Sequence, residues 1–162
     1  MNDKKKEFLT KFGSKKHLDK LVDDTDQSVQ WNIAKHGHKE HLDKLISSNS
    51  SVVRSAVANH GHKEHLDQLI HDPSSSVRER VAMHGNKEHL DKLVNDKDDF
   101  VRAEVAKHGH KKHLDKLMHD KDDYVKQFVI RNGNKEHLEH LTKDDDYTIA
   151  SSAKAKLRNL NK

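Results

Sequence analysis

The sequence predicts an all-α protein, an α-solenoid of six repeats that each contain two short helices. Three observations support this fold class. Glycines recur every 24 residues along the 162-residue chain, apolar residues follow the three- and four-residue spacing of amphipathic helices, and strand signals are absent. The glycines are Gly13, Gly37, Gly61, Gly85, Gly109 and Gly133. An unbroken period of this length is typical of stacked helical repeats.

The first helix of each repeat has a sequence of the type KEHLDKLI. In the second repeat, Leu42, Leu45 and Ile46 have i, i+3, i+4 spacing, so they lie on one side of a helix whose other side carries charged residues. The leading leucine recurs in every repeat, as Leu18, Leu42, Leu66, Leu90, Leu114 and Leu138.

The second helix of each repeat has a sequence of the type SVRERVAMH. Val77 and Val81 are four residues apart, and only aspartate or serine stands three residues before the column that contains Val77, which is valine in five repeats and isoleucine in the last. Those residues are typical N-caps, and the glycine after the helix suits a left-handed C-terminal cap. The N-cap positions are Asp26, Ser50, Ser74, Asp98, Asp122 and Asp146.

Stacking of the repeats follows from the length of these helices. Helices of about eight to ten residues are not stable alone, so neighbouring repeats must bury their apolar faces against one another. We therefore expect one helical-repeat domain over residues 1–162. It would contain an N-terminal cap half-repeat at 1–12, six repeats at 13–156 and a C-terminal cap at 157–162.

One stretch of sequence resembles a known repeat family. The run DPSSSVRERVA at 72–82, followed by Gly85 and the pair Leu90 and Leu93, resembles the leucine-rich repeat variant, a 24-residue relative of HEAT repeats. The resemblance extends over about 7–156 and is specific for architecture. It implies a right-handed superhelix of alternating α- and 3₁₀-helices, and it says little about function.

The resemblance also implies a structural role for some charged residues. In HEAT-type repeats, an aspartate six residues before an arginine braces neighbouring repeats. The outer repeats depart from this pattern, so we expect a charge ladder only in the middle of the chain. The matching pairs are Asp72/Arg78, Asp96/Arg102 and, with lysine for arginine, Asp120/Lys126. The founding leucine-rich repeat variant has a cysteine-bound iron–sulfur cluster, which does not carry over because this chain has no cysteine.

The composition excludes several functional classes. The absence of cysteine rules out a disulfide framework, a thiol nucleophile and cysteine-ligated zinc. The longest apolar run, at 128–130, is too short for a transmembrane helix or the core of a signal peptide. We therefore expect a cytoplasmic monomer that has no membrane contact and no cofactor.

Thirteen of the 16 histidines fall in three columns of the repeat. The motif His-Gly-His-Lys-Glu-His brings three imidazoles within six residues, which suggests Zn²⁺, Ni²⁺ or Cu²⁺. In two of these columns, asparagine or serine stands in place of histidine in other repeats. Both are poor ligands for those metals. We therefore favour capping and packing roles for the histidines. No metal site is assigned. The remaining candidates are His36, His38, His41, His60, His62 and His65.

Positions that vary between repeats predict a binding face. On the second helix, positions 19, 20 and 23 of the repeat vary most, and they carry the only tryptophan together with methionine, phenylalanine and basic residues. Aromatic residues with arginine are typical binding anchors, and the corresponding helices line the inner face of HEAT-like superhelices. The candidate residues are Trp31, Lys35, Asn59, Arg80, Met83, Lys107, Phe128 and Arg131.

A lysine occupies position 3 of every repeat. It either pairs with the acidic residue four positions later, such as Lys39 with Asp43, or forms a lysine ladder for a polyanion. The isoelectric point near 9.1 favours the polyanion, and the interleaved acidic residues argue against it.

No catalytic constellation stands out from the repeat pattern. The chain has no glycine-rich phosphate loop, no GxSxG motif and no HExxH motif. We therefore expect a non-enzymatic scaffold that binds a protein or peptide on the inner face of its superhelix. The alternatives are nucleic-acid binding through lysine and arginine, and a histidine-based module that responds to metal or pH.

Overall fold

The computed structural model describes residues 2–160, and within them it contains thirteen helices and no strand. The predicted all-α, two-helix repeat architecture is confirmed. The chain divides into two compact units, Met1–Val81 and Ala82–Lys162, and the boundary falls inside helix α7 (Ser75–Met83). Each unit is described by itself.

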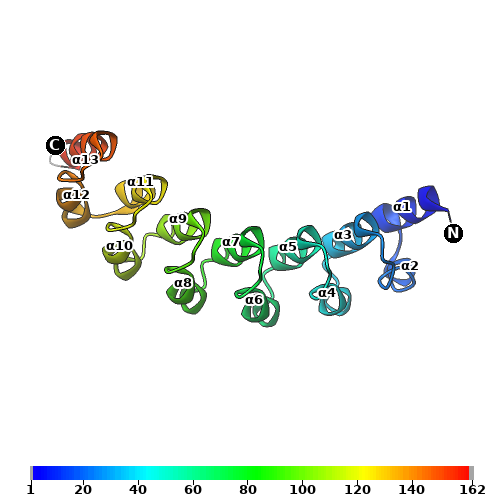
Figure 1. Cartoon of the computed structure of the whole chain (residues 1–162). Coiled ribbons are helices and arrows are strands. Elements are labelled where there is room, and N and C mark those ends of the chain that lie inside the picture. Colours follow the sequence, from blue (N-terminus) through cyan, green and yellow to red (C-terminus); the bar gives the residue numbers. More distant parts are fainter. Residues whose placement is uncertain (1, 161–162) are drawn as a thin grey trace. The chain divides into compact units, whose positions relative to one another are not determined.

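Unit 1 consists of long and short helices in alternation. In Figure 1 the long helices α1, α3 and α5 form one layer, and the short helices α2, α4 and α6 form a second layer. Helix α3 packs between α1 and α5. The helices are α1 (Asp3–Phe12), α2 (Lys15–Leu18), α3 (Gln27–His36), α4 (Lys39–Leu45), α5 (Ser51–Asn59) and α6 (Lys63–Leu69), followed by the first part of α7.

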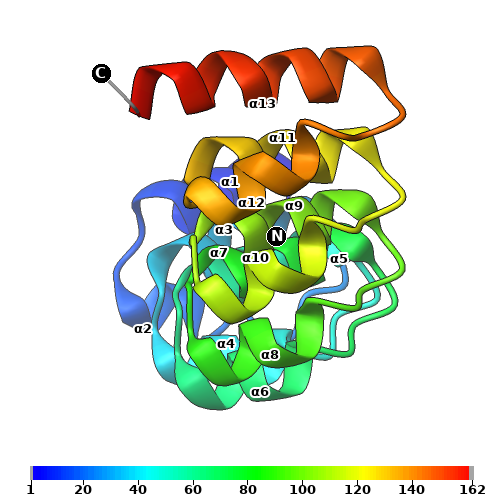
Figure 2. The same cartoon turned by 90° about the vertical axis from the view of Figure 1, so that its left-hand side faces the viewer.

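Unit 2 repeats the same two layers. Helix α11 packs against α9 and α13, and Figure 2 shows α11 and α12 beneath the long α13. Helix α13 continues to Leu160, so the predicted C-terminal cap is the end of this helix as far as the described residues go. The helices are α8 (Lys87–Leu93), α9 (Asp99–Lys107), α10 (Lys111–Leu117), α11 (Asp123–Asn132), α12 (Lys135–Leu141) and α13 (Tyr147–Leu160).

The core of each unit lies between the two layers. The predicted leucine and valine columns are buried throughout, with Leu42, Val53 and Leu138 at 0% exposure. Removing these side chains from water supplies the stability that the short helices lack, at about 25 cal/mol per Å² of apolar surface. The periodicity therefore identified the core correctly.

The short helices differ from the resemblance in their hydrogen bonding. In α4 the amides of Leu42 and Ile46 donate to carbonyls four residues earlier, both at 3.0 Å, which is α-helical geometry. The expected 3₁₀-helices are therefore wrong for the five seven-residue short helices. Bonds of the 3₁₀ type follow α2, from Leu21 to Leu18 and from Asp24 to Leu21, and the segments after the other short helices also contain them, as from Asp72 to Leu69. The other short helices are rich in leucine, lysine and glutamate, which favour the α-helix.

The predicted glycine cap occurs at four of the six glycines. Gly37, Gly61, Gly85 and Gly109 have φ values between 69° and 73°. Gly13 and Gly133 are extended, with φ of −75°. At these two positions the glycine amide continues the α-helical pattern, as in the 2.7 Å bond from Gly133 to the Val129 carbonyl, so no left-handed residue ends the helix.

The N-terminal segment forms a complete long helix. The predicted half-repeat at 1–12 contains α1, which is ten residues long and packs against α3.

Among residues 2–160, no helix combines the length and the apolar character that crossing a membrane requires.

Candidate functional site

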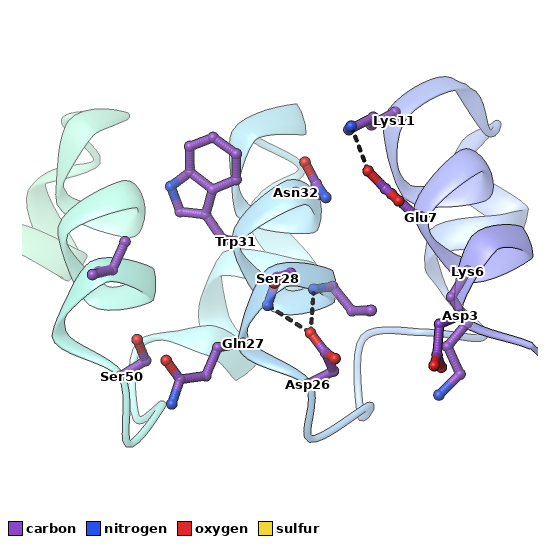
Figure 3. A pocket seen from close by; sticks show the side chains of 12 residues that line it. Asp3, Lys6, Glu7, Lys11, Asp26, Gln27, Ser28, Trp31, Asn32 and Ser50 are labelled. Carbon is purple, nitrogen blue, oxygen red and sulfur yellow. Dashed lines mark hydrogen bonds and ion pairs between the residues drawn. The ribbon is translucent and has the colours of Figure 1, made fainter.

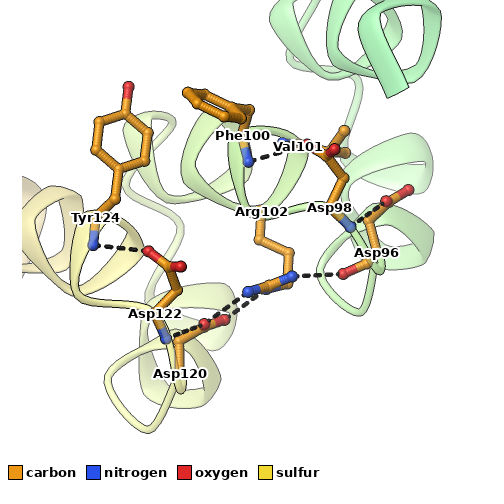
Figure 4. A network of polar contacts seen from close by, with 8 residues as sticks. All are labelled: Asp96, Asp98, Phe100, Val101, Arg102, Asp120, Asp122 and Tyr124. Atoms are coloured by element: carbon orange, nitrogen blue, oxygen red, sulfur yellow. Dashed lines mark hydrogen bonds and ion pairs between the residues drawn. The ribbon is translucent and has the colours of Figure 1, made fainter. Parts of the chain in front are cut away.

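An arginine–aspartate ladder joins neighbouring repeats within each unit. In unit 2, Arg102 donates two hydrogen bonds, of 2.6 and 2.8 Å, to the Asp120 carboxylate and a third, of 2.9 Å, to the Asp96 carbonyl (Figure 4). Both side chains are at most 8% exposed. The hydrogen bonds with Asp120 raise the pKa of Arg102 above its usual value. The guanidinium therefore fastens the loop of its own repeat to the loop of the next one.

The geometry of this ladder corrects the expected pairing. Arg78 meets its predicted partner Asp72 through the Asp72 backbone carbonyl, at 2.8 Å. The Asp72 carboxylate instead accepts from Arg54, which is 18 residues earlier, at 2.6 and 2.8 Å. Likewise, Arg102 contacts Asp96 through the carbonyl. The side-chain pair thus spans two repeats rather than lying within one.

The expectation that the ladder is confined to the middle of the chain is also wrong. The carboxylate that pairs with each basic residue stands 18 residues after it. With this spacing, basic residues of the outer repeats also have carboxylate partners. Lys126 binds Asp144 at 2.9 Å, and Lys6 binds Asp24 at 2.7 Å. The pair Gln30 and Ser48 has the same spacing but no charge. There the Ser48 hydroxyl donates to the Gln30 amide oxygen at 2.6 Å.

The histidines before the glycines bridge repeats through the backbone. The Nε2 atoms of His36, His60 and His108 lie 2.6 to 2.8 Å from a carbonyl of the preceding long helix, 26 residues earlier. Where histidine is replaced, another donor takes its place: Asn132 donates to Ala106 and Lys156 donates to Ile130. This column therefore requires a hydrogen-bond donor, which explains why asparagine and lysine substitute for histidine.

A second histidine column is buried at the interfaces between short helices. His41, His65, His113 and His137 are at most 2% exposed. Each Nε2 lies 2.6 to 2.8 Å from an aspartate of the preceding repeat, as in the pair His113 and Asp91. His113 and Lys87 together lower the pKa of Asp91 to about 2.

This geometry bears on the six candidate metal ligands. His36, His41, His60 and His65 use Nε2 for contacts between repeats. The rings of His38 and His62 pack edge-on against those of His41 and His65. Within residues 2–160, no three histidine, aspartate or glutamate side chains are arranged to hold a metal ion.

The lysine column is engaged in ion pairs. Each lysine at position 3 lies 2.9 to 3.7 Å from the acidic side chain four residues later. Lys15 and Lys111 also contact a glutamate of the next repeat. The predicted pairing is confirmed, and it leaves the column with little net positive field for a polyanion.

The candidate partner-binding residues lie on the long helices. Their exposed surface in each unit is called the long-helix face. In unit 1 it includes Trp31, which is 38% exposed and lies 4.5 Å from the Lys35 ammonium group. Asn59 and Arg80 are exposed on α5 and α7 of the same unit, and Met83, in unit 2, is 46% exposed.

A pocket of about 620 Å³ opens on the long-helix face of unit 1, beside α1, α3 and α5 (Figure 3). Trp31 and Val52 provide apolar surface, and Asn32 points toward α1. The ion pair between Glu7 and Lys11, at 2.7 Å, lies on the opposite side and lowers the pKa of Glu7. Such a volume is within the range of about 300–1,000 Å³ for ligand pockets.

An aromatic row lies on the long-helix face of unit 2. The ring centroids of Phe100 and Tyr124 are 5.3 Å apart, and those of Tyr124 and Phe128 are 5.0 Å apart. Figure 4 shows Phe100 and Tyr124 projecting on the same side of their helices. Lys107 and Arg131 both contact the Phe128 ring. The structure thus brings Lys107, Phe128 and Arg131 together, whereas Trp31 and Lys35 form a separate cluster in unit 1.

Sequence reasoning did not predict that α1 and Asn32 line the pocket of unit 1. Residues 1–12 were expected to be a cap, yet Asp3, Glu7 and Lys11 line the pocket. A signal for Asn32 was present in the sequence, because it stands three residues after Val29 on the buried side of α3. A polar residue in that position indicates a special environment.

Comparisons with known proteins identify the fold and leave the function open. No family model and no curated protein sequence matches the chain. A solved structure described as a leucine-rich repeat variant with a novel repetitive protein structural motif matches with a TM-score of 0.85 and 23% sequence identity. The match covers 94% of this chain and 65% of that one, so this chain spans just under two-thirds of the length of its structural neighbour. The chain therefore has the fold of a leucine-rich repeat variant.

Proposed function

We propose that this protein is a non-enzymatic scaffold that binds a protein or peptide through the long-helix face. One observation carries the proposal. Aromatic side chains stand next to exposed cations on this face in both units, with the exposed Trp31 beside Lys35 and the half-buried Phe128 beside Arg131. Exposed tryptophan, tyrosine and arginine are the side chains that most often dominate binding energy at protein interfaces.

The use of the other polar side chains supports this assignment. The arginine–aspartate ladder, the two bridging histidine columns and the lysine column all have partners within or between repeats. Their regular spacing is therefore explained by the stability of the stack. The residues on the long-helix face vary between repeats, and variation on a regular scaffold suits recognition of an irregular partner.

Nucleic-acid binding has less support. The lysines that would form a polyanion ladder are paired with carboxylates, and Lys107 is paired with Glu104. A metal-responsive module also has less support, because the contacts between repeats already use four of the six candidate histidines. We further propose that the long-helix face is the inner face of a superhelix.

Affinity capture with matched variants tests the proposed function. The protein is immobilised as wild type, as the double variant Trp31→Ala/Phe128→Ala, and as Tyr147→Ala, which removes an aromatic ring that is 84% exposed outside both clusters. Capture from a cell lysate is run at low and high salt, and protein and nucleic acid are both identified. We expect a protein that survives high salt, is lost with the double variant and is retained by Tyr147→Ala.

Two results would count against the scaffold proposal. Nucleic acid that elutes steeply with salt would favour the polyanion alternative, since its binding depends on the release of counterions. Equal capture by the wild type and the double variant would show that the long-helix face is not the binding surface.

A further inference from the structure

Two histidines outside the three columns lie against each other in unit 2. His119 follows α10 and His140 lies on α12 (Figure 1), and their ring centroids are 4.3 Å apart with the ring planes at 73°. Both residues are exposed. Within residues 2–160 neither side chain takes part in a hydrogen bond, whereas His113 uses Nε2 to hold a neighbouring repeat. The contacts that stabilise the stack therefore do not account for this pair.

The repeat geometry explains why the two rings meet. In unit 1, Asp23 and Lys44 stand at the same two repeat positions and form an ion pair at 3.0 Å. That ion pair joins the loop of one repeat to the short helix of the next. In unit 2 the same contact is made by His119 and His140, which are both bases and cannot pair as opposite charges. The sequence thus replaces an ion pair by two imidazoles.

The surroundings of His140 favour its neutral form. Desolvation, His119 and Lys143 lower the pKa of His140 below its ordinary value, and Asp144 acts in the opposite direction. Neutral imidazole is the form of histidine that binds metal ions. The pair therefore presents side chains that are suited to metal ligation.

The distance between the rings fits two ligands of one ion. Histidine nitrogens bind Zn²⁺ at about 2.0–2.1 Å, so two nitrogens on one ion lie within about 4.2 Å of each other. Because the centroids of His119 and His140 are 4.3 Å apart, rotation of the exposed side chains brings one nitrogen of each ring within that limit. The Asp144 carboxylate is held by Lys126 at 2.9 Å. We therefore assign two protein ligands, with water in the remaining coordination positions.

We propose that His119 and His140 together bind one divalent transition-metal ion, which fastens the last repeat to the repeat before it. Imidazole suits Zn²⁺, Cu²⁺ and Ni²⁺. The ion takes the structural place that the ion pair of Asp23 and Lys44 has in unit 1. The inference goes beyond the proposed function and does not depend on it.

Titration of the untagged, full-length chain with Zn²⁺ tests this inference. Isothermal titration calorimetry measures the dissociation constant of the tightest site in the wild type, in His119→Gln, in His140→Gln and in the variant with both changes. We expect each single substitution to weaken that site at least tenfold. Because both rings bind the same ion, the affinity of the double variant should lie within twofold of that of the weaker single variant.

The melting temperature gives a second measurement. An ion that binds only the folded chain stabilises it by mass action. Excess Zn²⁺ should therefore raise the melting temperature of the wild type, and at least half of this rise should be lost in His119→Gln and in His140→Gln.

Two control variants separate the site from folding and from other imidazoles. His71→Gln removes an exposed histidine of unit 1 and should bind Zn²⁺ within twofold of the wild type. The variant His119→Asp/His140→Lys introduces the residue types of the ion pair in unit 1. It should keep at least the melting temperature of the wild type in zinc-free buffer and should lose the tight site.

Three results would overturn the inference. The first is the absence of saturable Zn²⁺ binding to the wild type. The second is equal weakening by His71→Gln and the two single variants, which would indicate an adventitious ion only, bound by any exposed imidazole. The third is additive losses in the double variant, which would show that the two rings bind separate ions. None of these results bears on the long-helix face, which the capture experiment tests.

Discussion

The contacts between repeats and the long-helix face use similar residue types in opposite ways. Between repeats, Arg102 and His113 are buried, and each is held by an aspartate of a neighbouring repeat. On the long-helix face, Lys35 and Arg131 contact aromatic rings, and within residues 2–160 neither has a carboxylate partner. A cation between repeats stabilises the stack, whereas Lys35 and Arg131 on the face have charges that no carboxylate of the described residues neutralises.

Under the proposed function, the protein would use different residues for stability and for recognition. Every repeat needs the same contacts with its neighbours, so these residues recur with the 24-residue period. A partner imposes no such period, so the residues that meet it are free to differ. The predictions below test this division from the largest expected effect to the smallest.

The largest effect is expected from the arginine–aspartate ladder. Arg102→Ala leaves the Asp120 carboxylate buried without its partner, and we expect the free energy of unfolding to fall by about 3–5 kcal/mol. The control Trp31→Ala, on the long-helix face, should change it by less than about 1 kcal/mol. Urea unfolding followed by circular dichroism measures both values. Similar losses for the two variants would break the comparison.

Glycine substitutions should give a smaller, graded effect. Gly109→Ala places an alanine at a φ of 69° where its Cβ makes only ordinary van der Waals contacts, the nearest at 3.7 Å from Cβ of Asn132, so we expect only the left-handed strain, about 1–2 kcal/mol. Gly85→Ala adds a contact of 2.7 Å with Cε1 of His108, which bonds the Ala82 carbonyl. We therefore expect a greater loss of stability for Gly85→Ala in the same urea experiment. Equal losses would show that packing of histidine on glycine contributes nothing.

The smallest effect concerns the dependence of stability on pH. The pKa of Asp91 is about 2 in the folded chain and about 3.9 in an unfolded one, so its ionisation favours folding above pH 4. That contribution is lost as the pH falls from about 4 toward 2. Asp91→Asn should therefore show a shallower decline of melting temperature between pH 5 and 2.5 than the wild type. Parallel declines would show that the His113–Asp91 contact is not coupled to folding.

Several features could be predicted from residues alone because they depend on local periodicity. The glycine spacing located the helix ends, the leucine and valine columns identified the core, and the i, i+4 spacing of Lys39 and Asp43 predicted their ion pair. Each of these features lies within one repeat, where sequence distance and spatial distance are closely related.

Partners that lie in the next repeat could not be found in this way. Six-residue spacing suggested that Arg78 pairs with the Asp72 carboxylate, yet that carboxylate accepts from Arg54, 18 residues away. The histidines before the glycines looked like caps of their own helices, whereas His60 bonds a carbonyl 26 residues earlier. The stagger between stacked repeats sets these distances, and a one-dimensional pattern does not contain it.

The sequence by itself determined the repeat, its two helices, its buried columns and the class of repeat fold to which the chain belongs. Only the tertiary structure decided that α1 forms one wall of a pocket, that the short helices are α-helical, and that the buried histidines pair with aspartates of the preceding repeat. The physical reason is that a repeating pattern records what every repeat shares. A pocket arises where the side chains of three particular helices meet, and that meeting depends on their packing in space.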